Sequence, residues 1–147
     1  MDQTAVERYL HDHIPLSAAM GARVLSAIPE GVVLQAPLEP NLNHRDTAFG
    51  GSVAAMAVLA GWTLVHIRLR AEGMEARTVI QRSDVTYLHP VEEAFQAAAE
   101  APDPEAWTRF LRTLERWGRA RIQVETAVTC QGREVARLRG EYVTLRG

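Results

Sequence analysis

The chain has few of the features that mark secreted, disulfide-stabilised or nucleic-acid-binding proteins. Its 147 residues include a single cysteine, Cys130, which excludes an intrachain disulfide and favours a reducing compartment. The formal net charge of -2 and the pI near 6.2 give no reason to expect a nucleic acid as partner. The first residues are mixed and charged, without a basic and apolar leader. We therefore predict a cytoplasmic protein with no export signal.

One long segment is almost free of charge. The residues from Ser52 to Leu69 are rich in Ala, Leu, Val and Met and carry no charged side chain before Arg68. This run is too long for an ordinary strand and predicts a buried helix. Its length approaches that of a membrane span, but Gly61, His66 and the mean hydropathy of -0.13 favour burial inside a protein. With 47% hydrophobic residues, we expect a single domain over residues 1–147 and no membrane partner.

Small and polar residues precede this helix. The segment from Asn41 to Ser52 reads NLNHRDTAFGGS, which places Gly50 and Gly51 where the first helical turn begins. The first amides of a helix have no partner within the helix, and the helix dipole is positive at that end. Glycine has no Cβ to block the approach of a ligand. The segment therefore predicts a site for an anion, or for an oxygen that becomes one.

The remaining segments predict short helices and β-strands around the buried helix. One helix is expected over 2–13 and ends before Pro15, and a second is expected from Pro104, capped by Asp103, to Gly118. Strands are expected over 22–28, 32–38, 77–88, 94–99, 119–130 and 134–145. The alanines of 94–99 also suit a helix. This order indicates an α+β fold, with an antiparallel sheet wrapped around a long central helix and a helical insertion before the last two strands. Because such a sheet has open edges, pairing of two copies would cover them.

These residues resemble a known family. The arrangement is similar to hotdog-fold thioesterases, and NHRDTAFGGS followed by LAGW, together with the later TYLHPV, resembles the thioesterase-like domain at the C-terminus of YiiD-type proteins. The resemblance covers essentially the whole chain. It implies a hydrolase acting on acyl-CoA or acyl-carrier-protein thioesters in fatty acid metabolism. It also implies no metal, no cofactor beyond the CoA or phosphopantetheine of the substrate, and paired active sites at a homodimer interface, with assembly into tetramers left open.

The resemblance also assigns positions in the glycine-containing loop. Gly50 and Gly51 match the two glycines of a His-Gly-Gly motif in related thioesterases, and Asn43 falls where such enzymes often have an asparagine. Phe49 replaces the histidine, and Val58 occupies the helix position where many of these enzymes keep Asp or Glu. No acidic residue occurs between Gly50 and Arg70. A catalytic carboxylate must therefore come from elsewhere in the chain.

Asp46 and Asp84 are the candidate general bases, and each has an alternative interpretation. Asp46 lies in the loop and could instead cap the start of the helix. Asp84 lies within the strand over 77–88, where it could face the helix start of a second subunit or form a surface pair with Arg82. Asn43 could orient the attacking water or the thioester carbonyl, or simply be a turn residue. The catalytic candidates are therefore Asn43, Asp46, Gly50, Gly51 and Asp84.

Contacts with the substrate are assigned to His44, Phe49, Ser52 and Arg82. Arg119, Arg121, Arg133, Arg137 and Arg139 cluster on the last two strands, where they could bind CoA phosphates or an acidic carrier protein. An ordinary solvated sheet face explains these arginines equally well. The aromatic residues between Trp107 and Trp117 could line an acyl tunnel, although their helical spacing is more typical of a core.

Two other functions remain open at this point. A non-catalytic module that binds or senses acyl thioesters would keep the pocket and lack the base, as the missing helix carboxylate suggests. A hotdog hydratase or dehydratase would act on the same thioesters. It is disfavoured because the usual hydratase pairing of Asp and His, with its short fixed spacing, is not seen in the loop from Asn41 to Ser52.

Overall fold

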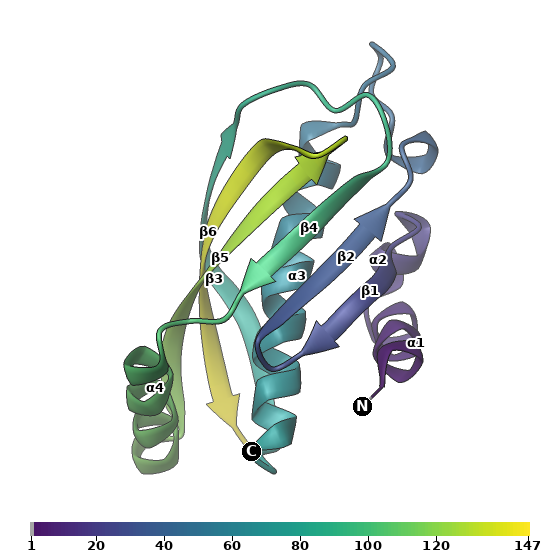
Figure 1. Cartoon of the computed structure of the whole chain (residues 1–147). Helices are drawn as coiled ribbons and strands as arrows, with labels where there is room; N and C mark the ends of the chain where they lie inside the picture. Colours follow the sequence, from purple (N-terminus) through teal and green to yellow (C-terminus); the bar gives the residue numbers. More distant parts are fainter. Residues whose placement is uncertain (1) are drawn as a thin grey trace.

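The computed structural model describes residues 2–147 as a six-stranded antiparallel sheet that curves around one long helix (Figure 1). The strands are β1 (Arg23–Ile28), β2 (Gly31–Ala36), β3 (Ala76–Tyr87), β4 (Phe95–Glu100), β5 (Arg119–Cys130) and β6 (Arg133–Arg146). The helices are α1 (Gln3–His13), α2 (Pro15–Ala19), η1 (Glu39–Asn41), α3 (Gly50–Ala71) and α4 (Pro104–Trp117). The predicted α+β class and the helical insertion before β5 and β6 are confirmed.

The strands do not follow one another across the sheet in sequence order. The spatial order is β1-β2-β4-β5-β6-β3, and every neighbouring pair is antiparallel. A hairpin joins β1 to β2 and a second one joins β5 to β6, with Gln131 and Gly132 at positive φ in its turn. β3 follows α3 in the chain but pairs only with β6. As a result, β1 and β3 form the two edges of the sheet.

Helix α3 fills the hollow of the sheet and supplies most of the core. Ten of its residues are buried: Val53, Met56, Ala57, Leu59, Ala60, Gly61, Thr63, Leu64, Val65 and Leu69. By length and composition this helix could span a membrane, yet it is the core helix of the fold. Tyr142 of β6 is fully buried against it and donates a hydrogen bond from Oη to the Val58 carbonyl at 2.8 Å. A Cβ on Gly61 would overlap the Tyr142 hydroxyl, so glycine is needed at this close approach.

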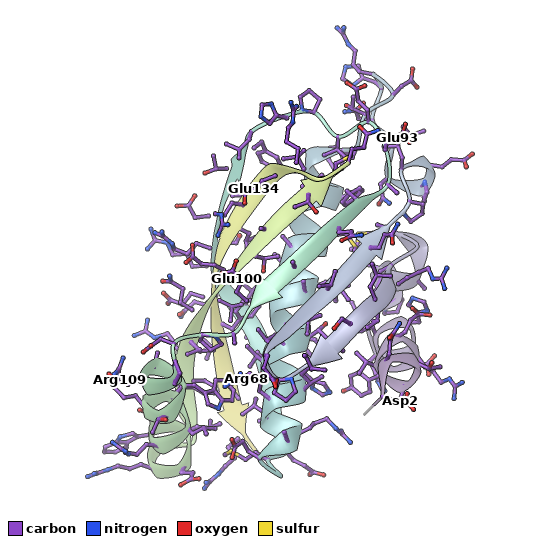
Figure 2. The ribbon with its side chains drawn as sticks, in the orientation of Figure 1. Asp2, Arg68, Glu93, Glu100, Arg109 and Glu134 are labelled. Carbon is purple, nitrogen blue, oxygen red and sulfur yellow. The ribbon has the colours of Figure 1, made fainter. Side chains whose placement is uncertain are left out.

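Helix α4 closes the end of the core near the C-terminal half of α3. Asp103 caps it by accepting a hydrogen bond from the Ala106 amide, and Gly118 ends it with a left-handed backbone at φ 73°. Its apolar residues Trp107, Phe110 and Leu114 are buried, which confirms the amphipathic pattern. Arg68 reaches from α3 toward α4, with its guanidinium 4.5 Å from the centre of the Trp107 ring (Figure 2). Trp107, Phe110 and Leu114 are therefore core residues, whereas Trp117 at the end of the helix is 70% exposed.

Helix α1 packs along the β1 edge of the sheet. Asp2 caps it through the Ala5 amide, as expected for a helix that begins near residue 2. The helix ends before Pro15 as predicted, but Pro15 then begins α2, which the sequence pattern did not indicate. Proline is well suited to the first position of a helix, where its missing N–H is not needed.

A β-bulge divides β3 into two parts, and it reverses which alternate residues point toward α3. The register with β6 shifts between Ile80 and Arg82, so one extra residue is inserted there. Beyond the bulge, Val85 pairs with the buried Leu138 on the α3 side of the sheet, whereas Asp84 pairs with Arg139 on the outer side. Side chains therefore alternate between the two faces beyond the bulge, although the two-residue period does not run unbroken through the strand.

Candidate active site at the start of α3

The loop before α3 is a compact turn that holds its own shape. Leu42 and Ala48 form an isolated antiparallel bridge at its base, and its tip projects beyond the sheet at the top of Figure 1. Both polar atoms of the Asn43 side chain form hydrogen bonds within the loop. Its Oδ1 accepts hydrogen bonds from the Arg45 and Thr47 amides at 2.7 and 3.2 Å, and its Nδ2 donates to Thr47 Oγ1 at 2.7 Å. Within one chain, Asn43 thus acts as a turn residue.

Two backbone amides are free where α3 begins. Phe49 is the N-cap residue, and its side chain forms no capping hydrogen bond. The Ser52 and Val53 amides donate to the Phe49 carbonyl at 2.9 and 3.1 Å. Among residues 2–147, neither the Gly50 nor the Gly51 amide has a hydrogen-bond acceptor outside the helix, and a first-turn amide has none within it. The start of α3 therefore presents two unpaired donors at the positive end of its dipole.

These donors adjoin a cleft of about 300 Å³. The cleft is lined by Ala48, Gly50, Val53, Tyr87, Leu88, His89, Pro90, Val91 and Val135. Its walls come from the start of α3, the end of β3 and the segment after β3, and they are mainly apolar. Phe49 is 58% exposed beside it, with its ring folded so closely over Gly51 that a Cβ there would clash. Gly50 is half-buried and lines the cleft beside the Tyr87 ring, whereas Gly51 is exposed and lies beneath the Phe49 ring.

The two polar candidates nearest the loop tip do not line this cleft. His44 and Asp46 are both exposed, and Asp46 adopts a left-handed backbone at φ 63°. Asp46 does not cap α3, because the N-cap position is Phe49, so the alternative role predicted for this carboxylate is wrong. Asn43 is likewise absent from the cleft lining of its own chain.

Asp84 and Arg82 lie on the outer face of the sheet, on the side opposite α3. They pair in register with Arg139 and Glu141 of β6. Asp84 lines a second cleft of about 410 Å³, together with Thr86, Leu88, Glu125, Glu134, Arg137 and Arg139. Within one chain, the structure therefore brings Phe49, Gly50, Gly51 and Ser52 together and separates Asp84 and Arg82 from them.

Two arginines of the last two strands, Arg121 and Arg137, form ion pairs with carboxylates. Arg137 pairs with Glu134 at 3.0 Å and with Glu125 at 3.8 Å, and Arg121 pairs with Glu141 at 3.4 Å. The hydrogen bond from Arg137 lowers the pKa of Glu134, whose carboxylate lies at the surface near the top of the sheet (Figure 2). Arg137 and Arg139 share the second cleft with three acidic side chains. This balance of charge favours a solvated sheet face over a phosphate site.

Other groups add little to the site, with one exception. Among residues 2–147, no three His, Cys, Asp or Glu side chains lie close enough together to hold a metal ion. Trp107, Phe110 and Leu114 belong to the core and do not line the cleft beside Gly50. The exception is Tyr87, which lines that cleft and donates a hydrogen bond to the Gly50 carbonyl at 2.9 Å. Its position at the end of the long strand, directly before Leu-His-Pro, is the one sequence signal for it.

Comparison with known proteins identifies the fold and the family. A family model described as "Putative thioesterase (yiiD_Cterm)" matches residues 3–146. A protein of unknown function from Chlorobaculum tepidum TLS is 31% identical, with a TM-score of 0.92 over 99% of this chain and 94% of that one. A "putative thioesterase" from Shewanella oneidensis is 27% identical, with a TM-score of 0.87 over 97% of this chain and 96% of that one.

A third similar structure supports the fold alone, because its sequence is more distant. It is a protein from Pseudomonas aeruginosa called a "Probable Thioesterase", 18% identical with a TM-score of 0.86 over 100% of this chain and 97% of that one. The resemblance seen in the loop and helix is thereby confirmed over the length of the chain. The family and the neighbouring structures support thioester hydrolysis as the general chemistry. The chain therefore belongs to the YiiD C-terminal thioesterase family and has its hotdog fold.

Proposed function

We propose that this chain hydrolyses acyl thioesters of CoA or of acyl carrier protein at the start of α3. Water attacks the thioester carbonyl carbon, a tetrahedral oxyanion forms, and the C–S bond breaks to give a carboxylic acid and a thiol. The proton lost by the water passes through a general base to the sulfur. The observation that supports this reaction is the pair of free Gly50 and Gly51 amides beside the apolar cleft.

The amides suit the charge that develops during this reaction. Backbone N–H groups that already point at the future oxyanion need no rearrangement as charge forms, and loss of one such donor typically costs roughly 3 to 4 kcal/mol of barrier. The uncapped start of α3 leaves both donors available, and glycine at both positions makes room for the Phe49 and Tyr87 rings that flank them. The apolar walls of the cleft suit an acyl chain and exclude water around the carbonyl.

Two copies of the chain would complete the site. The cleft of one chain contains no carboxylate among its lining residues, whereas a base is required to activate water. β3 has a free edge that a second β3 can pair with, so a homodimer can bring the projecting loop or β3 of one copy toward the cleft of the other. In this arrangement Asp46 or Asp84 acts as base and Asn43 orients water or the carbonyl.

The substrate contacts follow from the same arrangement. His44, Phe49 and Ser52 lie in or next to the loop, and Arg82 lies on β3 near its free edge. CoA or phosphopantetheine enters as part of the substrate, and no resident cofactor takes part. The protein would work as a single cytoplasmic domain in fatty acid metabolism, as a dimer or as a tetramer built from dimers.

Turnover of a defined panel of thioesters tests this function. The purified chain is assayed with acetyl-, hexanoyl-, decanoyl- and palmitoyl-CoA and with the same acyl groups on acyl carrier protein, by following thiol release. We expect hydrolysis of at least one member, and we expect either Asp46→Asn or Asp84→Asn to reduce kcat by a factor of at least about 100. Arg112→Ala, on the exposed face of α4, is the control. Absence of hydrolysis above background for every member would refute the enzyme assignment.

A non-catalytic acyl-thioester binding module is the second candidate, favoured by the lack of a carboxylate among the cleft residues. Calorimetry with the same acyl-CoA panel separates the two functions. Tight binding without turnover supports the binding module. An Asp46→Asn variant that loses turnover and retains binding supports the enzyme.

A further inference from the structure

Tyr87 is a residue of the cleft that neither the sequence pattern nor the family assignment gives a role. It is the last residue of β3 and pairs with Ala136 of β6, on the face of the sheet that carries α3. Its side chain is 54% exposed and forms part of the cleft wall beside Gly50. A large aromatic side chain at the mouth of a cleft is therefore also in contact with the helix start.

The contact between Tyr87 and the helix is specific. Tyr87 Oη donates a hydrogen bond to the Gly50 carbonyl oxygen at 2.9 Å. The ring lies against the open side of Gly50, since a Cβ built there would be 3.5 Å from ring atoms, at ordinary van der Waals distance. One side chain thus binds both the carbonyl and the exposed face of the first residue of α3.

This hydrogen bond also acts on the Gly51 amide. The Gly50 carbonyl and the Gly51 N–H belong to one planar peptide group, so fixing the direction of the oxygen fixes the direction of the hydrogen. A hydrogen bond accepted by the carbonyl also polarises the group and makes its N–H a stronger donor. Tyr87 therefore controls both the aim and the strength of one of the two free amides.

Among residues 2–147, Tyr87 forms the only side-chain hydrogen bond to this peptide group, whose carbonyl is otherwise the acceptor for the amide four residues later in α3. The N-cap residue Phe49 provides no side-chain hydrogen bond to the helix start. Glycine at both Gly50 and Gly51 gives the backbone more freedom than any other pair of residues. A hydroxyl that ties this first turn of α3 to the end of β3 can therefore have a measurable effect on its orientation.

We propose that Tyr87 is a positioning residue for thioester hydrolysis, which holds the Gly51 N–H toward the oxyanion through the Gly50 carbonyl. This role rests on the proposed function, because it assigns the Gly51 amide to the oxyanion. Tyr87 acts on the transition state through the backbone. Its hydroxyl should therefore affect kcat more than the affinity for the substrate.

Tyr87→Phe removes the hydroxyl and keeps the ring that forms the cleft wall. We expect kcat to fall about three- to tenfold with KM unchanged, as for the loss of one hydrogen bond. The matched control is Tyr142→Phe, which removes a tyrosine hydrogen bond of 2.8 Å to another carbonyl of the same helix, that of Val58 inside the core. The control is expected to lower the melting temperature and leave kcat unchanged. A Tyr87→Phe variant with the kcat of the original chain overturns the proposal.

The ¹⁵N resonance of Gly51 gives a second measurement that needs no activity. Tyr87→Phe is expected to shift it, because polarisation of the Gly50–Gly51 peptide group is lost, whereas Tyr142→Phe leaves it in place. If the original chain hydrolyses no thioester of the panel, the proposed function fails by itself. In that event, a shift of the Gly51 resonance in Tyr87→Phe still supports the proposal that Tyr87 positions this amide. An unchanged resonance overturns that proposal.

Discussion

The two edges of the sheet differ in how far side chains cover their backbone groups. At the β1 edge, three side chains spaced one helical turn apart on α1 bind backbone groups of the strand and the residue before it. Gln3 Nε2 donates to the Val24 carbonyl at 2.7 Å, the Val24 amide donates to Glu7 Oε1 at 2.8 Å, and His11 Nε2 lies 2.7 Å from the Ala22 carbonyl oxygen. The helix thus satisfies edge groups that would otherwise offer a template for another strand.

The β3 edge has no such cover over most of its length. Trp62 Nε1 donates to the Thr78 carbonyl near the start of the strand, and among residues 2–147 no other side chain forms a hydrogen bond with the backbone of β3. The longer β3 edge therefore leaves its backbone groups available for pairing with another strand. This difference supports the homodimer proposed above, with the two β3 strands side by side.

A charge placed on each edge in turn gives the largest expected effect. Val79 on β3 and Ile28 on β1 are matched aliphatic residues, 57% and 51% exposed. Val79→Asp is expected to weaken the dimer by about 100-fold, or about 3 kcal/mol, because the twofold axis introduces two unpaired carboxylates into one interface. Ile28→Asp is expected to leave the dimer intact. Analytical ultracentrifugation of both variants checks this, and equal dissociation of the two would contradict the assignment of the interface to β3.

Opening the closed edge is expected to have a smaller effect. Glu7→Ala deprives the Val24 amide of its acceptor and is expected to lower the free energy of unfolding by about 1 to 2 kcal/mol. The neighbouring exposed Arg8 provides the control, since Arg8→Ala on the same helix is expected to change it by less than about 0.5 kcal/mol. Urea denaturation measures both. Similar values for the two variants would show that α1 does not hold this edge through Glu7.

Acid provides a milder way to loosen the α1 side. His66 of α3 stacks on Tyr9 and Trp62, and burial, followed by the charges of Arg70 and His13, lowers its pKa to about 4. Between pH 6.5 and about 4 the unfolded chain binds a proton that the folded chain does not, so stability is complete above pH 6.5 and falls as the pH drops toward 4.

His66→Phe keeps the stacking and removes the proton site. Its melting temperature is therefore expected to depend less on pH between 7 and 4.5 than that of the original chain, as measured by differential scanning calorimetry. His44→Phe, in the exposed loop, is the comparison and is expected to retain the original pH dependence. An unchanged profile in the His66 variant would remove this residue from the acid response.

The smallest effect is expected on the outer face of the sheet between the two edges. Arg121 and Glu141 form an exposed pair at 3.4 Å there. Arg121→Ala is expected to change the free energy of unfolding by less than about 0.5 kcal/mol, as exposed ion pairs usually do, and to leave the KM for acyl-CoA unchanged. A several-fold increase in KM would instead favour a phosphate contact on this face.

Patterns that are local in the sequence predicted much of this structure. The Asp103 cap with Pro104 and the apolar run of α3 each depend on neighbouring residues, and each produced the expected helix. β2 ends at Ala36, two residues earlier than predicted. Pro37 follows, and proline has no N–H to donate to a neighbouring strand.

What the pattern could not supply depends on contacts between distant segments. The bulge after Ile80 reverses which residues of β3 face α3, and it is visible only in the pairing with β6. The hydrogen bond from Tyr87 to Gly50 joins residues on different elements, so no local period indicates it. The glycine loop stands out in the sequence because its composition is unusual, whereas the roles proposed for Asn43, Asp46 and Asp84 require a second copy of the chain.

The contact of Gly61 with Tyr142 limits how this family can vary. The phenol occupies the space of a missing side chain, so α3 can neither slide along the sheet nor rotate without losing it. An evolutionary change at one position therefore has to be matched at the other. Homologues with alanine or a larger residue at the equivalent of Gly61 are expected to carry a smaller side chain at the equivalent of Tyr142. Covariation of these two positions in a sequence alignment would then reflect how closely α3 packs against the sheet.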